Sequence, residues 1–415
     1  MGIVLAGSLA ASAASAGMTN GYDINRLLFQ PHPYAGQMGS NYRPAAPRAV
    51  PGAGTSPAQS GAVIQPAAVG YETSTEPAAD TPVRPAPRNR QQGEGGVWRL
   101  EYGNEDRGFL TNVFEPIFDP VFGGSPTDGG MTWGWRISYT PNSENPDWFG
   151  NLRPYLPWVS PGAVVRASYS LEQAAMTPSN LARADGRTIR PHAGFLAFDA
   201  RVALVEQINS RRQRIDSLDL VAGLVGPASG ARGVHEFVHS GIDEETDNWE
   251  EIKNEPIVNI NYEYGQRLFM YEPGGMANVE FHPYVGAALG NALTYGSLGM
   301  SVRVGKNLFR DMGGPRQRLM LSGENFVEPG DYWAWNIFLG AEGRAVAHSV
   351  FLDGNLFRDI DNDVDSKALV YDVQMGFEAG YGAKRFSITN VYRSREFDGQ
   401  QYTTEFVRLA ASLDF

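Results

Sequence analysis

The stretch Thr404-Glu-Phe-Val-Arg-Leu-Ala-Ala-Ser-Leu-Asp-Phe415 ends the chain and alternates between two kinds of residue. Every second position from Val407 to Phe415 is apolar, whereas Arg408, Ser412 and Asp414 lie between them. A period of two places the two sets on opposite faces of a β-strand. A last strand of this kind, closing on a Phe, is typical of outer-membrane β-barrels, whose lipid-facing and lumen-facing side chains alternate.

The same alternation recurs back to residue 97, in runs mostly near ten residues long, as a tilted membrane strand requires. A soluble β-sandwich also alternates, but its strands are about five or six residues long. We count about twelve runs, an even number that lets the first and last strands of an antiparallel barrel pair. The predicted strands are 97–102, 131–139, 163–171, 193–208, 215–225, 257–271, 279–289, 293–304, 333–349, 368–381, 385–396 and 402–415.

Aromatic residues gather near the ends of these runs, which is consistent with girdles at the two membrane interfaces. For each residue alone, an ordinary core position is an equal alternative, so only the collective placement counts. The aromatic residues concerned are Trp98, Trp133, Trp135, Tyr155, Trp158, Trp333 and Trp335.

The composition excludes several classes of protein. The 415 residues include 48 glycines and 27 prolines, with 19% charged residues, which favours many short strands and a long structureless segment. The absence of cysteine excludes disulfides, thiolate metal sites and thiol catalysis. A formal charge of -12 argues against nucleic acid as a partner. No run is long and apolar enough for a membrane-spanning helix.

The N-terminal part predicts export and a flexible segment. Residues 1–17 contain a small, apolar run that ends in Ala14-Ser15-Ala16, so we expect a signal peptide that begins upstream of Met1, with an Ala-rich disordered tail as the alternative. Residues 18–96 are rich in Pro and Ala and predict a disordered periplasmic segment able to contact a partner. Residues 97–415 then form the barrel.

Two histidines lie in the connection between predicted strands 215–225 and 257–271. His235 and His239 are four residues apart, so on a helix both imidazoles project from one face, next to the acidic run Asp243–Asp247. Taken alone, such a pair is more often solvent-facing or part of a core than catalytic. The acidic run alone is more often a solvated loop.

Several short motifs, taken in order, closely resemble the LpxR-type lipid A deacylases of the Gram-negative outer membrane. No single motif is diagnostic, but their order and spacing are specific, and the resemblance covers residues 97–415. The motifs are Arg190-Pro-His-Ala-Gly194, Gly226-Pro-Ala-Ser-Gly230, His239, Trp249, Lys253-Asn-Glu-Pro256, Val285-Gly-Ala-Ala-Leu-Gly-Asn291, Glu342-Gly-Arg-Ala-Val-Ala347 and Phe351-Leu-Asp-Gly-Asn355.

The resemblance implies a twelve-stranded barrel with a short helix in an extracellular loop, and a carboxylic-ester hydrolase that removes the 3'-linked acyl chain of lipid A. His239 would activate water as general base, with Thr132 across the barrel wall and Arg190 as a cation for phosphate or the oxyanion. Lipid A, other lipopolysaccharide and outer-membrane lipids would be its partners.

The resemblance also implies a calcium ion, which oxygen ligands would hold. The proposed ligands are Asn104, Glu105, Asp106 and Glu245, with Asp243 and Glu244 as competitors of the last.

Three departures from the family pattern keep a second function open. Glu105 stands where the family has Asp, Trp133 where it has Asn, and His235 where it has Gln. The alternative is a barrel of the same family that has lost catalysis and serves as a structural or interaction protein of the outer membrane. A diffusion porin is less favoured, because twelve strands enclose little lumen and Phe338 and Arg344 are expected to fill it.

Overall fold

The computed structural model describes ten ranges of the chain: residues 95–105, 131–152, 162–177, 190–209, 212–242, 252–271, 277–308, 332–358, 364–400 and 403–414. The predicted signal peptide, residues 1–17, and all but the end of the predicted Pro/Ala-rich segment, residues 18–96, lie outside them. Both therefore remain predictions.

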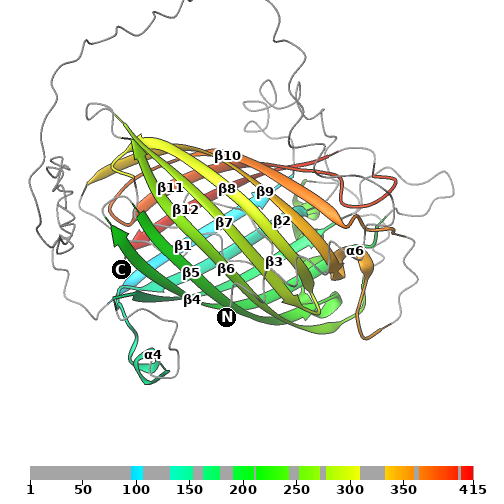
Figure 1. The fold of residues 1–415 in the computed structure, drawn as a ribbon. Helices are drawn as coiled ribbons and strands as arrows, with labels where there is room; N and C mark the ends of the chain where they lie inside the picture. Colours follow the sequence, from blue (N-terminus) through cyan, green and yellow to red (C-terminus); the bar gives the residue numbers. More distant parts are fainter. Residues whose placement is uncertain are drawn as a thin grey trace, which may run out of the picture. The chain divides into compact units, whose positions relative to one another are not determined.

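Twelve antiparallel strands form a closed barrel in which each strand pairs with its chain neighbours and β1 pairs with β12 (Figure 1). This confirms the predicted fold class and strand number. The strands are β1 Gly96–Asn104, β2 Met131–Pro141, β3 Val164–Met176, β4 Ala193–Asn209, β5 Arg212–Val225, β6 Glu255–Tyr271, β7 Asn278–Gly290, β8 Leu293–Lys306, β9 Trp333–Ser349, β10 Leu369–Tyr381, β11 Lys384–Arg393 and β12 Thr404–Asp414.

The alternation of the sequence sets which side chains face lipid. On β9, Ile337 and Leu339 are 55% and 54% exposed, whereas Asn336 and Phe338 between them are buried. Neighbouring strands repeat the pattern, because paired residues share a face of the sheet. The barrel thus shows an apolar surface to the membrane and a polar interior, as predicted.

Ion pairs fill much of that interior. Glu280 accepts hydrogen bonds from Arg267 and Arg303 at 2.9 and 2.7 Å, and all three side chains are almost fully buried. Glu101 is surrounded in the same way by arginines of β1, β2 and β12, namely Arg99, Arg136 and Arg408. Buried charged groups need partners of opposite charge, because they are removed from water. The interior is therefore a packed polar core.

The helices lie at the two ends of the barrel. α4 (Asp147–Leu152) follows β2 at one end, and α6 (Val350–Asp353) follows β9 at the opposite end, here called the mouth (Figure 1). η2 (Pro227–Ser229) and α5 (Ala231–Ile242) connect β5 to β6, also at the mouth. Phe351 of α6 packs against Phe195 of β4, with ring centroids 5.5 Å apart, as part of an apolar cluster. None of the described helices combines the length and apolar character needed to cross a membrane.

Candidate functional site

A glycine turn positions the helix that carries His239. Gly226 has φ 96°, a conformation that favours glycine, and a Cβ there would lie 2.7 Å from the backbone of Lys253. Its N–H donates to the carbonyl of Gly194 at 2.8 Å. Gly230, also at positive φ, ends η2, and α5 begins at Ala231. The segment therefore leaves β5 along one fixed path.

α5 packs on the lipid-facing side of the barrel wall, against β3 and β4. Ala231, at its first turn, is buried with Trp133 of β2 and Ala175 of β3. Gln173 of β3 donates to the carbonyl of Ser229 at 2.7 Å and accepts a hydrogen bond from the Trp135 indole at 3.0 Å. The helix is thus held outside the barrel by both apolar and polar contacts.

Two described residues show which face of α5 packs against the barrel. Ala231 and His235 are both buried, and they are four residues apart. His239 follows one turn later on the same face of the helix. The side chain of His239 lies outside the described part of the structure, as does that of Thr132, which precedes Trp133 in β2. Their roles remain predictions, although the backbone places both on elements that meet at this wall.

Trp133 lies under the start of α5 rather than in contact with lipid. It is 7% exposed, and it pairs across the strands with Asn104 of β1. Its indole Nε1–H is buried and has no hydrogen-bond partner among the described residues. The Trp133 side chain therefore supports the first turn of α5. Its indole N–H remains beside the helix as a hydrogen-bond donor.

The predicted calcium ligands separate onto two sides of the wall. Asn104 is on the lipid-facing side, where its amide donates to the hydroxyl of Tyr102 at 3.3 Å. Glu105 is 3% exposed, and its carboxylate interacts electrostatically with Arg190 and Arg393. Asp106 and Glu245 lie outside the described residues. Within the described ranges, no group of three or more His, Asp or Glu side chains is arranged to hold a metal ion.

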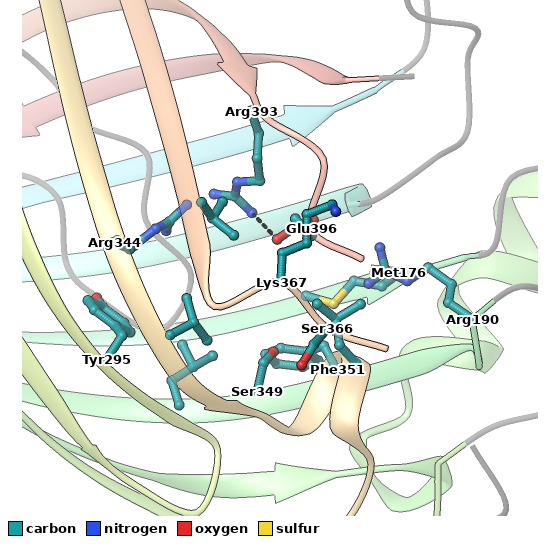
Figure 2. Close-up of a pocket in the computed structure, with 14 residues that line it drawn as sticks. Met176, Arg190, Tyr295, Arg344, Ser349, Phe351, Ser366, Lys367, Arg393 and Glu396 are labelled. Atoms are coloured by element: carbon teal, nitrogen blue, oxygen red, sulfur yellow. Dashed lines mark hydrogen bonds and ion pairs between the residues drawn. The ribbon is translucent and has the colours of Figure 1, made fainter. Parts of the chain in front are cut away.

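Arg190 lines a small cavity inside the mouth, between α6 and the ends of β8 to β11 (Figure 2). Burial lowers the pKa of its guanidinium, which Glu396 and Glu105 partly offset. Arg344 and Arg393 enter the cavity from the other side and share the carboxylate of Asp372, at 2.8 and 2.9 Å. The structure thus brings Arg190 together with Glu105, while Asn104 lies on the lipid-facing side.

Comparison with known proteins assigns the chain to a family. Residues 117–415 match the family described as outer membrane protein LpxR. The chain belongs to the LpxR family. LpxR from Salmonella typhimurium is similar in fold, with 19% identity and a TM-score of 0.59 over 77% of this chain and 100% of that chain. The β domain of the Bordetella autotransporter BrkA is less similar, with 9% identity and a TM-score of 0.39 over 78% of this chain and 100% of that chain. A search of curated proteins found no match.

Membership of the LpxR family places the barrel in the outer membrane of a Gram-negative bacterium, with α5 in an extracellular loop. The family-like motifs acquire a structural role there. Asn355 donates to the carbonyl of Lys253 at 2.8 Å and accepts from its N–H at 2.9 Å. Asn254 accepts from the N–H of Ala228, and Asn291 donates to Glu255. These contacts, here called the rim brace, join α6 and the β7–β8 turn to both ends of the loop that carries α5.

Proposed function

We propose that this LpxR family member hydrolyses an acyl ester of lipid A, at the 3' position, with water activated by His239. The proposal rests on the position of α5, which packs on the lipid-facing wall beside β2 and β3. A lipid in the outer leaflet reaches such a site sideways, from the membrane plane. It has no need to enter the interior, which ion pairs and aromatic side chains fill.

The proposed reaction needs a base, a water molecule and an ester carbonyl. The His239 imidazole takes a proton from the water, since its ordinary pKa lies near neutrality. The water oxygen attacks the carbonyl carbon, the ester C–O bond breaks, and the imidazolium gives its proton to the leaving sugar oxygen. The products are a free fatty acid and a sugar hydroxyl. Thr132, from β2, is proposed to orient the water or the ester. Arg190 stays a predicted cation for the phosphate or the oxyanion, but its buried guanidinium lines the cavity inside the mouth, so the proposed reaction on the lipid-facing wall assigns it no step.

The proposed calcium ion requires ligands on the same side as the ester. The amide of Asn104 fits such a site, because it lies on the lipid-facing side and offers an oxygen. Glu105 fits less well, because its buried carboxylate interacts with Arg190. We therefore propose Asn104, Asp106 and Glu245 as ligands. When bound, calcium would polarise the ester carbonyl.

Two of the three departures from the family pattern favour the alternative function, a structural or interaction protein of the outer membrane. Glu105 faces the cations of the mouth, and Trp133 occupies the space beneath α5. In that case the protein would keep the barrel, the rim brace and α5 but would not hydrolyse lipid A.

Purified barrel mixed with lipid A separates the two functions. We expect release of a fatty acid that is lost on addition of a calcium chelator and falls by about 10² to 10⁴ in His239→Ala, the usual effect of removing a general base. Arg232→Ala, on the solvent face of α5, is the matched control and should keep its activity. Calcium binding measured by equilibrium dialysis gives a second readout. No release by the wild type would favour the alternative.

A further inference from the structure

α5 has a polar flank and an apolar flank, on opposite sides of the face that packs against the barrel. A helix turns by about 100° per residue. Arg232 and Glu236, the polar flank, therefore lie on one side of the packed face, where they form an exposed ion pair at 2.7 Å. Val234 and Phe237, the apolar flank, lie on the other side and are 37% and 78% exposed. The helix thus offers two chemically different surfaces to its surroundings.

The helix lies at the edge of the lipid-exposed part of the barrel wall. On β3, the outward-facing Ala175 and Gln173 are buried beneath η2 and α5, whereas Leu171, further from the mouth, is exposed. On β2, Trp133 is buried under the helix, whereas Ile137 is exposed. Four residues of a strand span about 13 Å. The covered wall therefore gives way to lipid-exposed wall within that distance of α5.

This position sets the conditions that the two flanks of α5 must meet. Amphipathic helices at a membrane surface bury aliphatic and aromatic side chains about 5 to 10 Å into the boundary between headgroups and acyl chains, and keep charged side chains in water. α5 meets both conditions when its apolar flank faces the exposed wall residues and its polar flank faces the extracellular side. The reverse arrangement would place the Arg232–Glu236 pair in hydrocarbon, where charges are costly.

We propose that α5 is an interfacial helix whose apolar flank, Val234 and Phe237, inserts among the acyl chains of the outer leaflet. The partner of this flank is lipid rather than another protein, because the flank borders the apolar surface that β2 and β3 already present to the membrane. Insertion holds the helix at the depth where acyl chains meet headgroups. The inference requires no turnover, so it stands apart from the proposed hydrolysis.

The depth of each flank can be measured directly, because the chain contains no cysteine. The full chain, in phosphatidylcholine bilayers, carries one nitroxide label, attached through Phe237→Cys or, as the matched control on the polar flank, through Glu236→Cys. Leu171→Cys provides a lipid-exposed reference on the barrel wall. Collisions of the label with oxygen, which concentrates in hydrocarbon, are compared with collisions with a water-soluble nickel complex. We expect oxygen to dominate at positions 237 and 171, and the nickel complex at position 236.

Loss of the apolar flank should also loosen the helix in the bilayer. We expect Phe237→Gln to speed amide hydrogen exchange of residues 231–242 by about tenfold or more, because it removes the free energy of burying a phenylalanine side chain. Phe237→Leu, which stays apolar, and Glu236→Gln should change the exchange rate much less. Heat-modified gel mobility checks that each barrel is folded.

Three outcomes would overturn the inference. The first is a label at position 237 that meets the nickel complex more often than oxygen. The second is a label there that a second protein shields from both. The third is equal hydrogen exchange of α5 in folded Phe237→Gln and the wild type. If position 237 is in lipid but no fatty acid is released from lipid A, the inference holds and the proposed hydrolysis fails.

Discussion

At the scale of single residues, Trp133 shows how a departure from the family pattern is accommodated. Its indole is buried against Ala175 and Ala231, so it supports the helix from below. The cost of this arrangement is one buried N–H without a partner among the described residues. Substitutions of Trp133 can therefore test the packing of its side chain separately from its hydrogen bonding.

Trp133→Ala should loosen α5, because a large buried aromatic side chain contributes about 3 to 5 kcal/mol through packing. Trp133→Phe should keep the helix in place, since it retains most of the apolar contact and removes only the unpartnered donor. Amide hydrogen exchange of residues 231–242 would measure the difference. Equal protection of α5 in both variants would contradict the packing role.

We expect Asp353 to make the mouth sensitive to acid. Burial raises the pKa of Asp353, but hydrogen bonds from His348, Ser366 and the Ser349 N–H outweigh it and hold the pKa below 3.8. A depressed carboxylate pKa stabilises the fold above the unfolded value, and that contribution is lost as pH falls through the folded pKa. We expect α6 to lose protease resistance below about pH 4, and Asp353→Asn to remove this pH dependence. Identical pH profiles in wild type and Asp353→Asn would contradict it.

At the scale of elements, period-two alternation was enough to predict the barrel. The strand 333–349 was predicted with the observed limits, and others, such as 385–396, differ by a few residues at their ends. The site was harder, because it depends on loops that meet in space. The same alternation could nevertheless have placed Asn104 and Glu105 on opposite sides of the barrel wall. The rim brace had no such signal, since side-chain amides bonded to distant backbone leave no period in the sequence.

Removing one member of the rim brace should affect activity more than folding. Asn355→Ala loses two hydrogen bonds to Lys253, worth about 1 to 3 kcal/mol together. We expect greater hydrogen exchange in residues 252–255 and slower release of fatty acid, with the barrel intact. Gln266→Ala, which loses side-chain hydrogen bonds with Arg212 and Tyr264 far from the mouth, is the control. Equal activity in both variants would show that the brace does not position α5.

At the scale of the whole molecule, ion pairs fill the interior of the barrel, and the proposed chemistry lies on its outer wall. Glu280→Ala would leave Arg267 and Arg303 buried without their shared carboxylate, which should destabilise the barrel by about 3 to 5 kcal/mol. Arg232→Ala removes an exposed pair with Glu236 and should change stability by less than about 0.5 kcal/mol. Urea unfolding in detergent would compare them. Similar midpoints would contradict the importance of the interior pairs.

We propose that an acyl chain of lipid A is removed at the lipid-facing wall beneath α5. Mass spectrometry of lipid A from Gram-negative cells with and without this chain tests it most directly. We predict a lipid A species lighter by one 3'-linked acyl chain when the wild type is present, and none with His239→Ala at the same level of folded barrel. Unchanged lipid A in cells that contain folded wild-type barrel would contradict the account.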